Sequence, residues 1–315
     1  MWDGWYGLRE DDRLLHAGAF NWTYTLGTGL MDPWSRGATA LIPSEGTPYE
    51  ALGGLLAQHS ASLFAAAPGV YRRLLRGTVP SLPQLRHGIS AGEKLSLGDR
   101  ARWEEVTGCP VHEAFGMTEC STFISGSPDR PATPDAAGYV QPGRRVALLD
   151  ENGPVPRAEI GQIAVHRNDP GLMLGYYNAP EATEERFQGE WFLTGDLASM
   201  KDDDAIIYEG RNDDMMNAGG TRVSPVEVEN AMLCHPHISE AAACSVQVRT
   251  GVSVIAGFYV ATDMIDEQEF RVFLQRSLAA YKLPRLLIPR DALPRGANNK
   301  LRRAALRDTW ETADG

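Results

Sequence analysis

The segment Glu209–Glu229 reads EGRNDDMMNAGGTRVSPVEVE, and it contains the signals that divide this chain in two. A turn-rich stretch surrounds Arg211, where polar residues and glycines interrupt the apolar pattern as they do between folded regions. Ser224 follows, three residues before Glu227 and directly before a proline, and this pattern predicts the capped start of a helix. The sequence therefore predicts that a separate small domain begins after Arg211.

Upstream of this segment, the chain alternates helix and strand signals. Short apolar runs predict buried strands, and apolar residues at helical spacing predict helices between them. The expected strands are 62–66, 86–90 and 111–115, and the expected helices are 47–59, 70–75 and 96–107. Thr47 and Glu50 have the spacing of a capping box at the start of the first helix. This alternation predicts an α/β fold with a parallel sheet, whose ligands collect at the carboxyl ends of the strands.

The sequence pattern changes between about residues 131 and 208. Here short strand signals alternate with the turn-forming residues Gly, Pro, Asn and Asp. This pattern predicts a β-rich subdomain that completes a large domain of residues 1–210. The acidic run 202–204 is typical of a solvated hairpin tip, because Mg²⁺ and Ca²⁺ loops need spaced oxygen ligands. Residues 211–315 predict a small α+β domain. Its expected elements are strands at 238–248 and 253–261 and a helix capped by Asp266.

Composition narrows the function classes. The chain has 315 residues, of which 43% are hydrophobic, and this is enough for two domains with real cores. Its net charge of -11 argues against binding to nucleic acid, since phosphate backbones require a basic surface. No apolar run is long enough to span a bilayer, and the first residues lack the basic and apolar regions of a secretion signal.

The four cysteines and seven histidines have no metal-binding spacing, since neither CxxC nor HxxxH pairs occur. The cysteines are also too few for a disulfide scaffold in a chain of this length. We expect idle thiols in the reducing environment of the cytoplasm. A homo-oligomer is compatible with this composition, which does not determine the oligomeric state.

The stretch Phe115–Glu119 follows an expected strand and combines an aromatic ring, a glycine, a hydroxyl and a carboxylate. The glycine permits a tight turn. An aromatic ring at this position can stack on a purine, and a carboxylate beside phosphates can hold Mg²⁺, which prefers oxygen ligands. An ordinary strand-to-loop turn explains the same residues equally well.

A second polar pair, Asp196 and Arg211, flanks an expected hairpin. An aspartate at the end of a strand can accept hydrogen bonds from both hydroxyls of a ribose, and Arg211 could return to the same ribose. Alternatively, Arg211 forms a surface ion pair with Asp213 or Asp214, which contributes little free energy.

Lys300 is the strongest single candidate for chemistry. It follows the loop 294–299, and it lies close to Arg302, Arg303 and Arg307 in a chain that is otherwise acidic. A mobile ammonium can neutralise charge that builds up on a carboxylate oxygen or a phosphate. A solvated basic tail is the simpler alternative.

Four residues near the N-terminus are candidates for an apolar substrate pocket, and packing in the core is the favoured interpretation for them. They are His16, Phe20, Trp22 and Tyr24.

Taken together in their order along the chain, the stretches at 115–119, 194–196, 209–229 and 294–303 resemble the adenylate-forming superfamily. In detail, they resemble its medium-chain and benzoate-type acyl-CoA ligases. Ala67–Arg72 resembles their APxxYR segment, Ser90–Glu93 matches their SAGE turn, and Gly220–Asn230 matches their GxRxxPxEVEN segment. The likeness covers nearly the whole chain, as the C-terminal half to two-thirds of such an enzyme. It implies the remainder of a large adenylate-forming domain, followed by a small mobile C-terminal domain.

The resemblance implies a ligase that uses ATP and Mg²⁺ to convert a small carboxylic acid into acyl-AMP, and then transfers the acyl group to coenzyme A. Medium-chain fatty acids and aryl acids are equally open as substrates, so fatty acid metabolism is one expected setting. The small domain would rotate between the two steps, with Asp213 as the hinge that absorbs the change in backbone angles.

The resemblance also implies the site residues. The nucleotide would contact Gly92, Glu93, Glu113, Ala114, Phe115, Gly116, Met117, Thr118, Asp196, Arg211 and Lys300. The catalytic residues would be Lys300, Thr118 and Glu119, with Glu119 at the metal ion. Coenzyme A would bind Gly219, Gly220, Thr221, Arg222 and Arg249, with help from the segment 280–285.

The sequence departs from the family pattern in three places. Asn299 replaces the glycine before the lysine, and asparagine tolerates unusual backbone angles. The hairpin tip 203–205 reads Asp-Asp-Ala in place of Asp-Gly-Tyr. The family's phosphate loop, a run of Ser, Thr and Gly followed by Lys, is missing, and Gly27–Gly29 is no substitute. We therefore expect a ligase that is truncated at its N-terminus.

Two other functions remain open. One is a non-catalytic fragment that binds AMP or acyl-AMP without turnover. The other is an adenylation domain that loads a carrier protein, although the GxRxxPxEVEN segment and the basic C-terminal loop favour coenzyme A.

Overall fold

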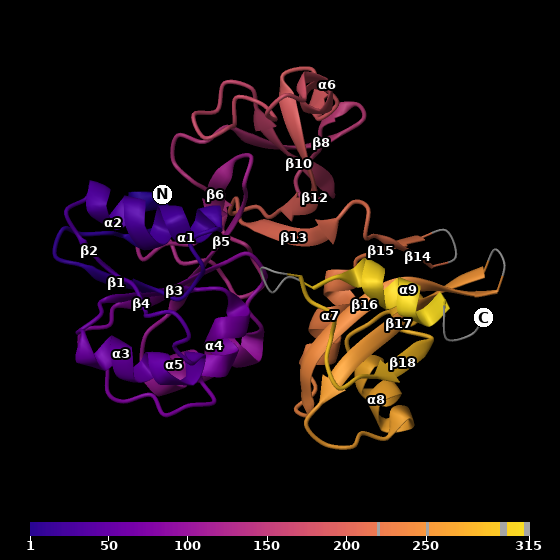
Figure 1. Ribbon diagram of the computed structural model, residues 1–315. Coiled ribbons are helices and arrows are strands. Elements are labelled where there is room, and N and C mark those ends of the chain that lie inside the picture. The colour runs from indigo at the N-terminus through magenta and orange to yellow at the C-terminus, as the bar shows by residue number, and fades with distance from the viewer. Residues whose placement is uncertain (219–220, 250–251, 297–300, 312–315) are drawn as a thin grey trace. The chain divides into compact units, whose positions relative to one another are not determined.

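The computed structural model describes residues 1–218, 221–249, 252–296 and 301–311. The chain divides into two compact units. The first comprises residues 1–194 and 198–208, and the second comprises residues 195–197 and 209–315. Figure 1 shows the helices and strands of both units.

A seven-stranded sheet forms the centre of the first unit, in the order β2-β1-β3-β4-β5-β6-β7. Strands β1 to β5 run parallel, and β6 and β7 add antiparallel strands at one edge. The parallel part confirms the α/β class predicted from strand–helix alternation. The strands are β1 Arg13–His16, β2 Thr39–Leu41, β3 Leu63–Ala66, β4 His87–Ala91, β5 Val111–Met117, β6 Ser121–Ser125 and β7 Tyr139–Val140.

Helices cover both faces of this sheet, with α1 and α2 on one side and α3, α4 and α5 on the other (Figure 1). Alternating side chains of the strands explain the two layers, since successive residues point to opposite faces. Leu15 packs in one core cluster with Trp103, whereas its neighbour Leu14 packs in another with Trp5 and Tyr24. The helices are α1 Thr23–Leu26, α2 Asp32–Ser35, α3 Leu52–Gln58, α4 Pro68–Leu74 and α5 Leu97–Thr107.

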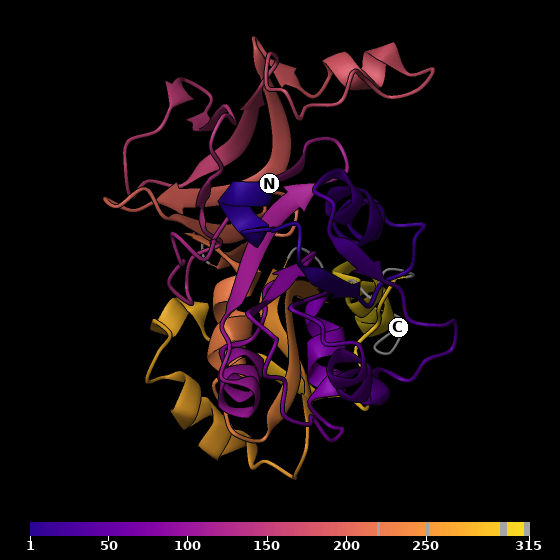
Figure 2. The same ribbon diagram turned by 90° about the vertical axis from the view of Figure 1, so that its left-hand side faces the viewer.

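The N-terminal turn of π-helix, Trp2–Tyr6, lies against strands β5 and β6 (Figure 2). The indole of Trp5 donates to the carbonyl of His112, and the hydroxyl of Ser125 donates to the carbonyl of Gly4. A second π-helical turn, Gly27–Met31, joins α1 to α2.

A second sheet forms the predicted β-rich subdomain, in the order β11-β12-β10-β8-β9 with β13 paired to β12. Its core contains Ile163, Val165 and Phe192, which pack against Phe123 of the first sheet. The elements are β8 Val146–Asp150, β9 Gly153–Pro154, β10 Gly161–His166, α6 Pro180–Glu184, β11 Phe187–Gln188, β12 Trp191–Met200 and β13 Ile206–Arg211.

The second unit is built on the three-stranded sheet β16-β17-β18, in which β16 and β17 are antiparallel and β18 is parallel to β17. Met232 of α7 and Phe270 of α8 pack in one cluster, and Leu306 of α9 packs in another. The elements are β14 Met216–Ala218, β15 Thr221–Val223, α7 Pro225–Leu233, β16 Ile238–Arg249, β17 Val252–Ala261, α8 Glu267–Leu274, a 3-10 turn Ala280–Lys282, β18 Leu286–Pro289 and α9 Arg303–Glu311.

Two of the three predicted helix caps are confirmed. The hydroxyl of Ser224 accepts from the N–H of Glu227 at 3.3 Å, and the carboxylate of Asp266 accepts from the N–H of Glu269 at 3.0 Å. The cap predicted at Thr47 is wrong. Its hydroxyl instead donates to the carbonyl of Ser44 at 2.7 Å, and a 3-10 turn, Tyr49–Ala51, precedes α3.

The glycine turn predicted at Gly116 is also wrong, because β5 continues to Met117. The register between β5 and β6 shifts between Phe115 and Gly116. A Cβ atom on Gly116 would lie 2.4 Å from the carbonyl oxygen of Ser121, so glycine is required by the close approach of β6.

The core interpretation is confirmed for His16 and Tyr24, which are buried, whereas Phe20 lies at the surface. The acidic tip 202–204 is a turn between β12 and β13, as predicted. All four cysteines are free thiols. Within the described ranges, no helix combines the length and apolar character that crossing a membrane requires.

Candidate active site

The turn between β5 and β6 carries Thr118 and Glu119, the first exposed and the second half-buried. Glu119 Oε1 accepts a hydrogen bond from the Tyr176 hydroxyl at 2.8 Å, and its carbonyl accepts from the N–H of Met173 at 2.7 Å. Among the described residues, no other hydrogen bond or ion pair reaches this carboxylate. One oxygen is therefore held, and Oε2 remains available to a ligand.

A buried arginine supports the same turn from the β-rich subdomain. Arg144 donates to the carbonyls of Cys120 and Thr122 at 2.8 and 2.7 Å, and its Nε pairs with Asp169. Charged side chains are rarely buried unless they are paired in this way. Neither Arg144, Asp169 nor Tyr176 was identified from the sequence. The only signal was the turn-forming run around Asp169, which carries no information about its distant partner.

Phe115 lies on β5 at the edge of the core, in ring contact with Phe123 and Tyr208. The centroid distances are 5.5 and 5.4 Å. Partial burial raises the pKa of Tyr176, and the hydrogen bond to Glu119 adds to the shift, so the hydroxyl remains protonated as a donor. Phe115 thus lies on the last parallel strand, and Glu119 lies on the turn that follows it.

Gly92 follows β4 with a φ of 99°, and a Cβ atom there would lie 2.7 Å from the ring of Trp22. Only glycine satisfies both constraints. Glu113 is buried, where its carboxylate accepts from the N–H of Leu95 at 2.7 Å and pairs with Arg100. Burial raises the pKa of Glu113, and the charge of Arg100 opposes the shift. Its side chain is therefore already engaged within the fold.

In the second unit, Arg211 lies beside two of the predicted partners. Its Nη1 is 3.7 Å from Asp196 Oδ2, and its Nε is 3.0 Å from Asp213 Oδ1. Burial would raise the pKa of Asp213, but the hydrogen bond and charge of Arg211 outweigh it and lower that pKa. The ion pair expected with Asp213 is therefore present, and Arg211 also approaches the buried Asp196, while a ribose-binding role stays a prediction.

The residues predicted to bind coenzyme A are only partly described. Thr221 and Arg222 lie on β15, and Arg222 donates to the side-chain and backbone oxygens of Asn212 at 2.6 and 3.2 Å. Arg249 is exposed at the end of β16. Gly219, Gly220 and Lys300 lie outside the described residues.

Lys282, in the segment 280–285, forms an ion pair within the second unit. Its ammonium donates to both carboxylate oxygens of Glu227, at 2.6 and 2.7 Å. This pair ties the segment to helix α7 within the second unit.

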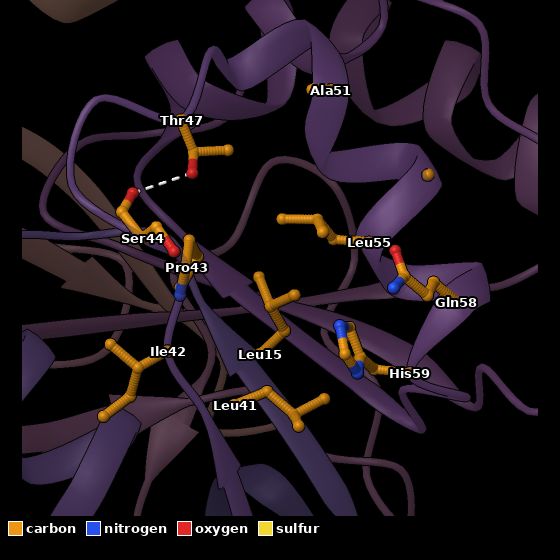
Figure 3. A pocket seen from close by; sticks show the side chains of 11 residues that line it. Leu15, Leu41, Ile42, Pro43, Ser44, Thr47, Ala51, Leu55, Gln58 and His59 are labelled. Atoms are coloured by element: carbon orange, nitrogen blue, oxygen red, sulfur yellow. Dashed lines mark hydrogen bonds between the residues drawn. The ribbon is translucent and has the colours of Figure 1, made fainter.

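The pocket in Figure 3 lies between the ends of β1 and β2 and helix α3, and it has a volume of about 410 Å³. Leu15, Leu41 and Leu55 line it, and His59 is its only titratable residue. None of the described predicted site residues contributes to this pocket. Its lining is mainly apolar and contains no lysine or arginine to neutralise phosphate charge, so we do not assign it to a nucleotide.

The residues at the β5–β6 turn suit Mg²⁺ without forming a protein cage. No cluster of three or more metal-binding side chains occurs in the part of the chain that the structure describes. Mg²⁺ commonly uses one or two carboxylates together with substrate phosphates and water. A single carboxylate with one oxygen available, as at Glu119, fits that pattern.

Comparison with known sequences identifies the family. A sequence profile of the AMP-binding enzymes matches residues 1–177, which is more than half of the chain. The chain belongs to the AMP-binding enzyme family. A profile of the AMP-binding enzyme C-terminal domain also matches residues 227–300, in the second unit.

Relatives within the AMP-binding enzymes share both sequence and fold with the chain. Benzoate–CoA ligase of Thauera aromatica is 30% identical over 319 residues, which cover 96% of this chain and 59% of that protein. The crystal structure of anthranilate CoA ligase AuaEII with anthranoyl-AMP has a TM-score of 0.90 at 29% identity, covering 98% of this chain and 61% of that one.

A benzoate CoA ligase from Burkholderia xenovorans LB400 gives a TM-score of 0.86 at 31% identity, with coverage of 96% and 62%. The chain thus spans about 60% of the length of these AMP-binding relatives.

Proposed function

We propose that the chain acts in a carboxylic acid–thiol ligase, which activates an acid as acyl-AMP and transfers it to coenzyme A. The observation that supports this proposal most directly is the position of Glu119. Its carboxylate lies at the carboxyl end of the parallel sheet, and one of its oxygens is held by Tyr176. Ligands of parallel α/β sheets bind at this edge. Family membership supports the same reaction class.

The roles follow from the chemistry of each group. We assign Glu119 Oε2 to Mg²⁺, which would neutralise charge on the phosphates when it is bound. Phe115 provides an aromatic surface near adenine, and Gly92 allows the backbone after β4 to turn. Thr118 offers an exposed hydroxyl to the phosphates.

In the second unit, we assign Asp196 and Arg211 to the ribose and Asp213 to the hinge. Arg211 already lies beside both aspartates. Lys300 would stabilise charge during adenylation, and Thr221, Arg222 and Arg249 would bind coenzyme A. We place the protein in the cytoplasm, which is consistent with its free thiols.

The substrate class that we favour is an aryl carboxylic acid. Benzoate and anthranilate are named for relatives of this chain. Medium-chain fatty acids are the alternative class, and a panel of acids separates the two.

Acid-dependent release of pyrophosphate from ATP and Mg²⁺ tests the function. The panel runs from acetate through octanoate to benzoate and anthranilate, with Lys300→Ala as the control variant. Release that requires both an acid and Lys300 supports the ligase and identifies its acid class. Binding of AMP without any release would contradict turnover by this chain and favour a binding-only role.

A further inference from the structure

The loop between β10 and α6 contacts Glu119 twice, through a side chain and through the backbone. The hydroxyl of Tyr176 donates to Glu119 Oε1, and the N–H of Met173 donates to the Glu119 carbonyl. Tyr176 is 57 residues from Glu119 in the chain. We propose that Tyr176 is a positioning residue, which orients Glu119 so that Oε2 faces the divalent cation of a metal–nucleotide complex. This inference rests on the proposed function.

Tyr176 is itself fixed through its backbone. Its N–H donates to the hydroxyl of Thr183 on α6 at 2.9 Å, and that hydroxyl donates to the carbonyl of Ala179 at 3.0 Å. The start of the loop is held by Asp169, which accepts from the N–H of Gly171 at 2.8 Å. The tyrosine therefore belongs to a segment that is anchored at both ends.

The neighbours of Tyr176 show that its inward orientation is specific. Tyr177 is 93% exposed and Leu174 is fully exposed, whereas Tyr176 is partly buried against the β5–β6 turn. Two adjacent tyrosines thus have opposite environments. This contrast provides a matched control, since Tyr177→Phe makes the same chemical change as Tyr176→Phe but removes a hydroxyl from a side chain exposed to solvent.

A held carboxylate binds a small cation better than a rotating one. Mg²⁺ demands near-ideal octahedral geometry, so the oxygen that it receives must point in one direction. A carboxylate with one oxygen fixed by a hydroxyl has already lost the rotational freedom that binding would otherwise remove. Removing a hydrogen bond to a metal ligand typically weakens metal binding by about 10-fold to 100-fold.

The experiment measures binding of Mn²⁺ in the presence of ATP by electron paramagnetic resonance, with Mn²⁺ as the probe for Mg²⁺. The unmodified chain is compared with Tyr176→Phe and Tyr177→Phe. Affinity for AMP without metal is measured in parallel, because a merely structural defect would change both quantities. Thermal midpoints report whether each variant folds.

We expect Mn²⁺ to bind about tenfold more weakly to Tyr176→Phe, with AMP affinity retained and with Tyr177→Phe unchanged. Equal Mn²⁺ affinity in Tyr176→Phe and the unmodified chain would overturn the positioning role and leave the proposed function standing. Parallel losses of Mn²⁺ and AMP affinity would overturn it in favour of a structural role. If the unmodified chain binds AMP and ATP but no Mn²⁺, the positioning role fails together with the assignment of Glu119 to the metal ion. If it binds no nucleotide, the proposed ligase function fails as well.

Discussion

Asp169 and Arg144 form a buried ion pair beneath the turn that carries Glu119. The Arg144 Nε lies 2.9 Å from Asp169 Oδ1, and their side chains are 9% and 0% exposed. Asp169 also accepts from the backbone N–H groups of Arg145 and Gly171, at 2.6 and 2.8 Å. The carboxylate is therefore fully satisfied, and it connects the β-rich subdomain to the turn after β5.

We predict that Asp169→Ala lowers the free energy of unfolding by about 3–5 kcal/mol, because it leaves Arg144 buried without its counter-charge. Urea unfolding followed by tryptophan fluorescence measures the change. Glu105→Ala is the control, since Glu105 pairs with Arg102 at an exposed site on α5, where ion pairs contribute little. Equal effects of the two substitutions would contradict the role assigned to the buried pair.

Gly116→Ala and Gly54→Ala should change stability in opposite directions. A Cβ atom on Gly116 would lie 2.4 Å from a backbone oxygen that cannot move away, so we expect destabilisation and displacement of the β5–β6 turn. No atom lies within 4 Å of a Cβ on Gly54, which is in helix α3, so alanine there should stabilise by about 0.5–1 kcal/mol. Thermal unfolding of the two variants checks both signs, and stabilisation by Gly116→Ala would refute the steric argument.

Stability should fall as pH decreases below about 6.5, because three histidines are buried in the first unit. Burial lowers the pKa of His16 to about 3, of His87 to about 4 and of His112 to about 3. The unfolded chain takes up a proton near pH 6.5, whereas the folded chain does so only near these lower values. Between the two, the unfolded state binds more protons, so acid favours unfolding.

For His16 alone, the slope is about 1.4 kcal/mol per pH unit between its two pKa values. His16→Leu should reduce the pH dependence of the unfolding free energy by that amount. Neither ring nitrogen of His16 has a hydrogen-bond partner among the described residues, so the substitution removes no such contact. Urea unfolding at pH 7, 6 and 5 measures the slope, and an unchanged slope would show that His16 is not kept neutral by burial.

Asp196→Asn should reduce the preference for AMP over 2′,3′-dideoxy-AMP. A site built to bond hydroxyls rejects an analogue that lacks them, because its buried polar groups are left unpaired. Asp196 is buried, so we expect the preference to fall by about tenfold in the variant. Calorimetric titration with both nucleotides gives the ratio. If the ratio is the same in both proteins, Asp196 does not bind the ribose.

Prediction from the sequence succeeded where the signal was local. The caps at Ser224 and Asp266 are contacts between residues three positions apart. Short apolar runs likewise predicted strands from neighbouring residues alone. It failed at Thr47, where the hydroxyl bonds to the carbonyl of Ser44 on the side of the motif away from the helix, and at Gly116, where the partner strand approaches. In both cases, a contact outside the motif decided the conformation.

The sequence by itself determined the α/β class and the chemical groups of the candidate site, because periodicity, caps and motif spacing depend on neighbours in the chain. Only the tertiary structure decided which of these groups already have hydrogen-bond or ion-pair partners within the fold. Glu119 receives Tyr176 from 57 positions away, and Glu113 faces Arg100 inside the fold. The physical reason is that a hydrogen bond or ion pair depends on distance in space, and packing of the sheets sets that distance between residues that the chain keeps far apart.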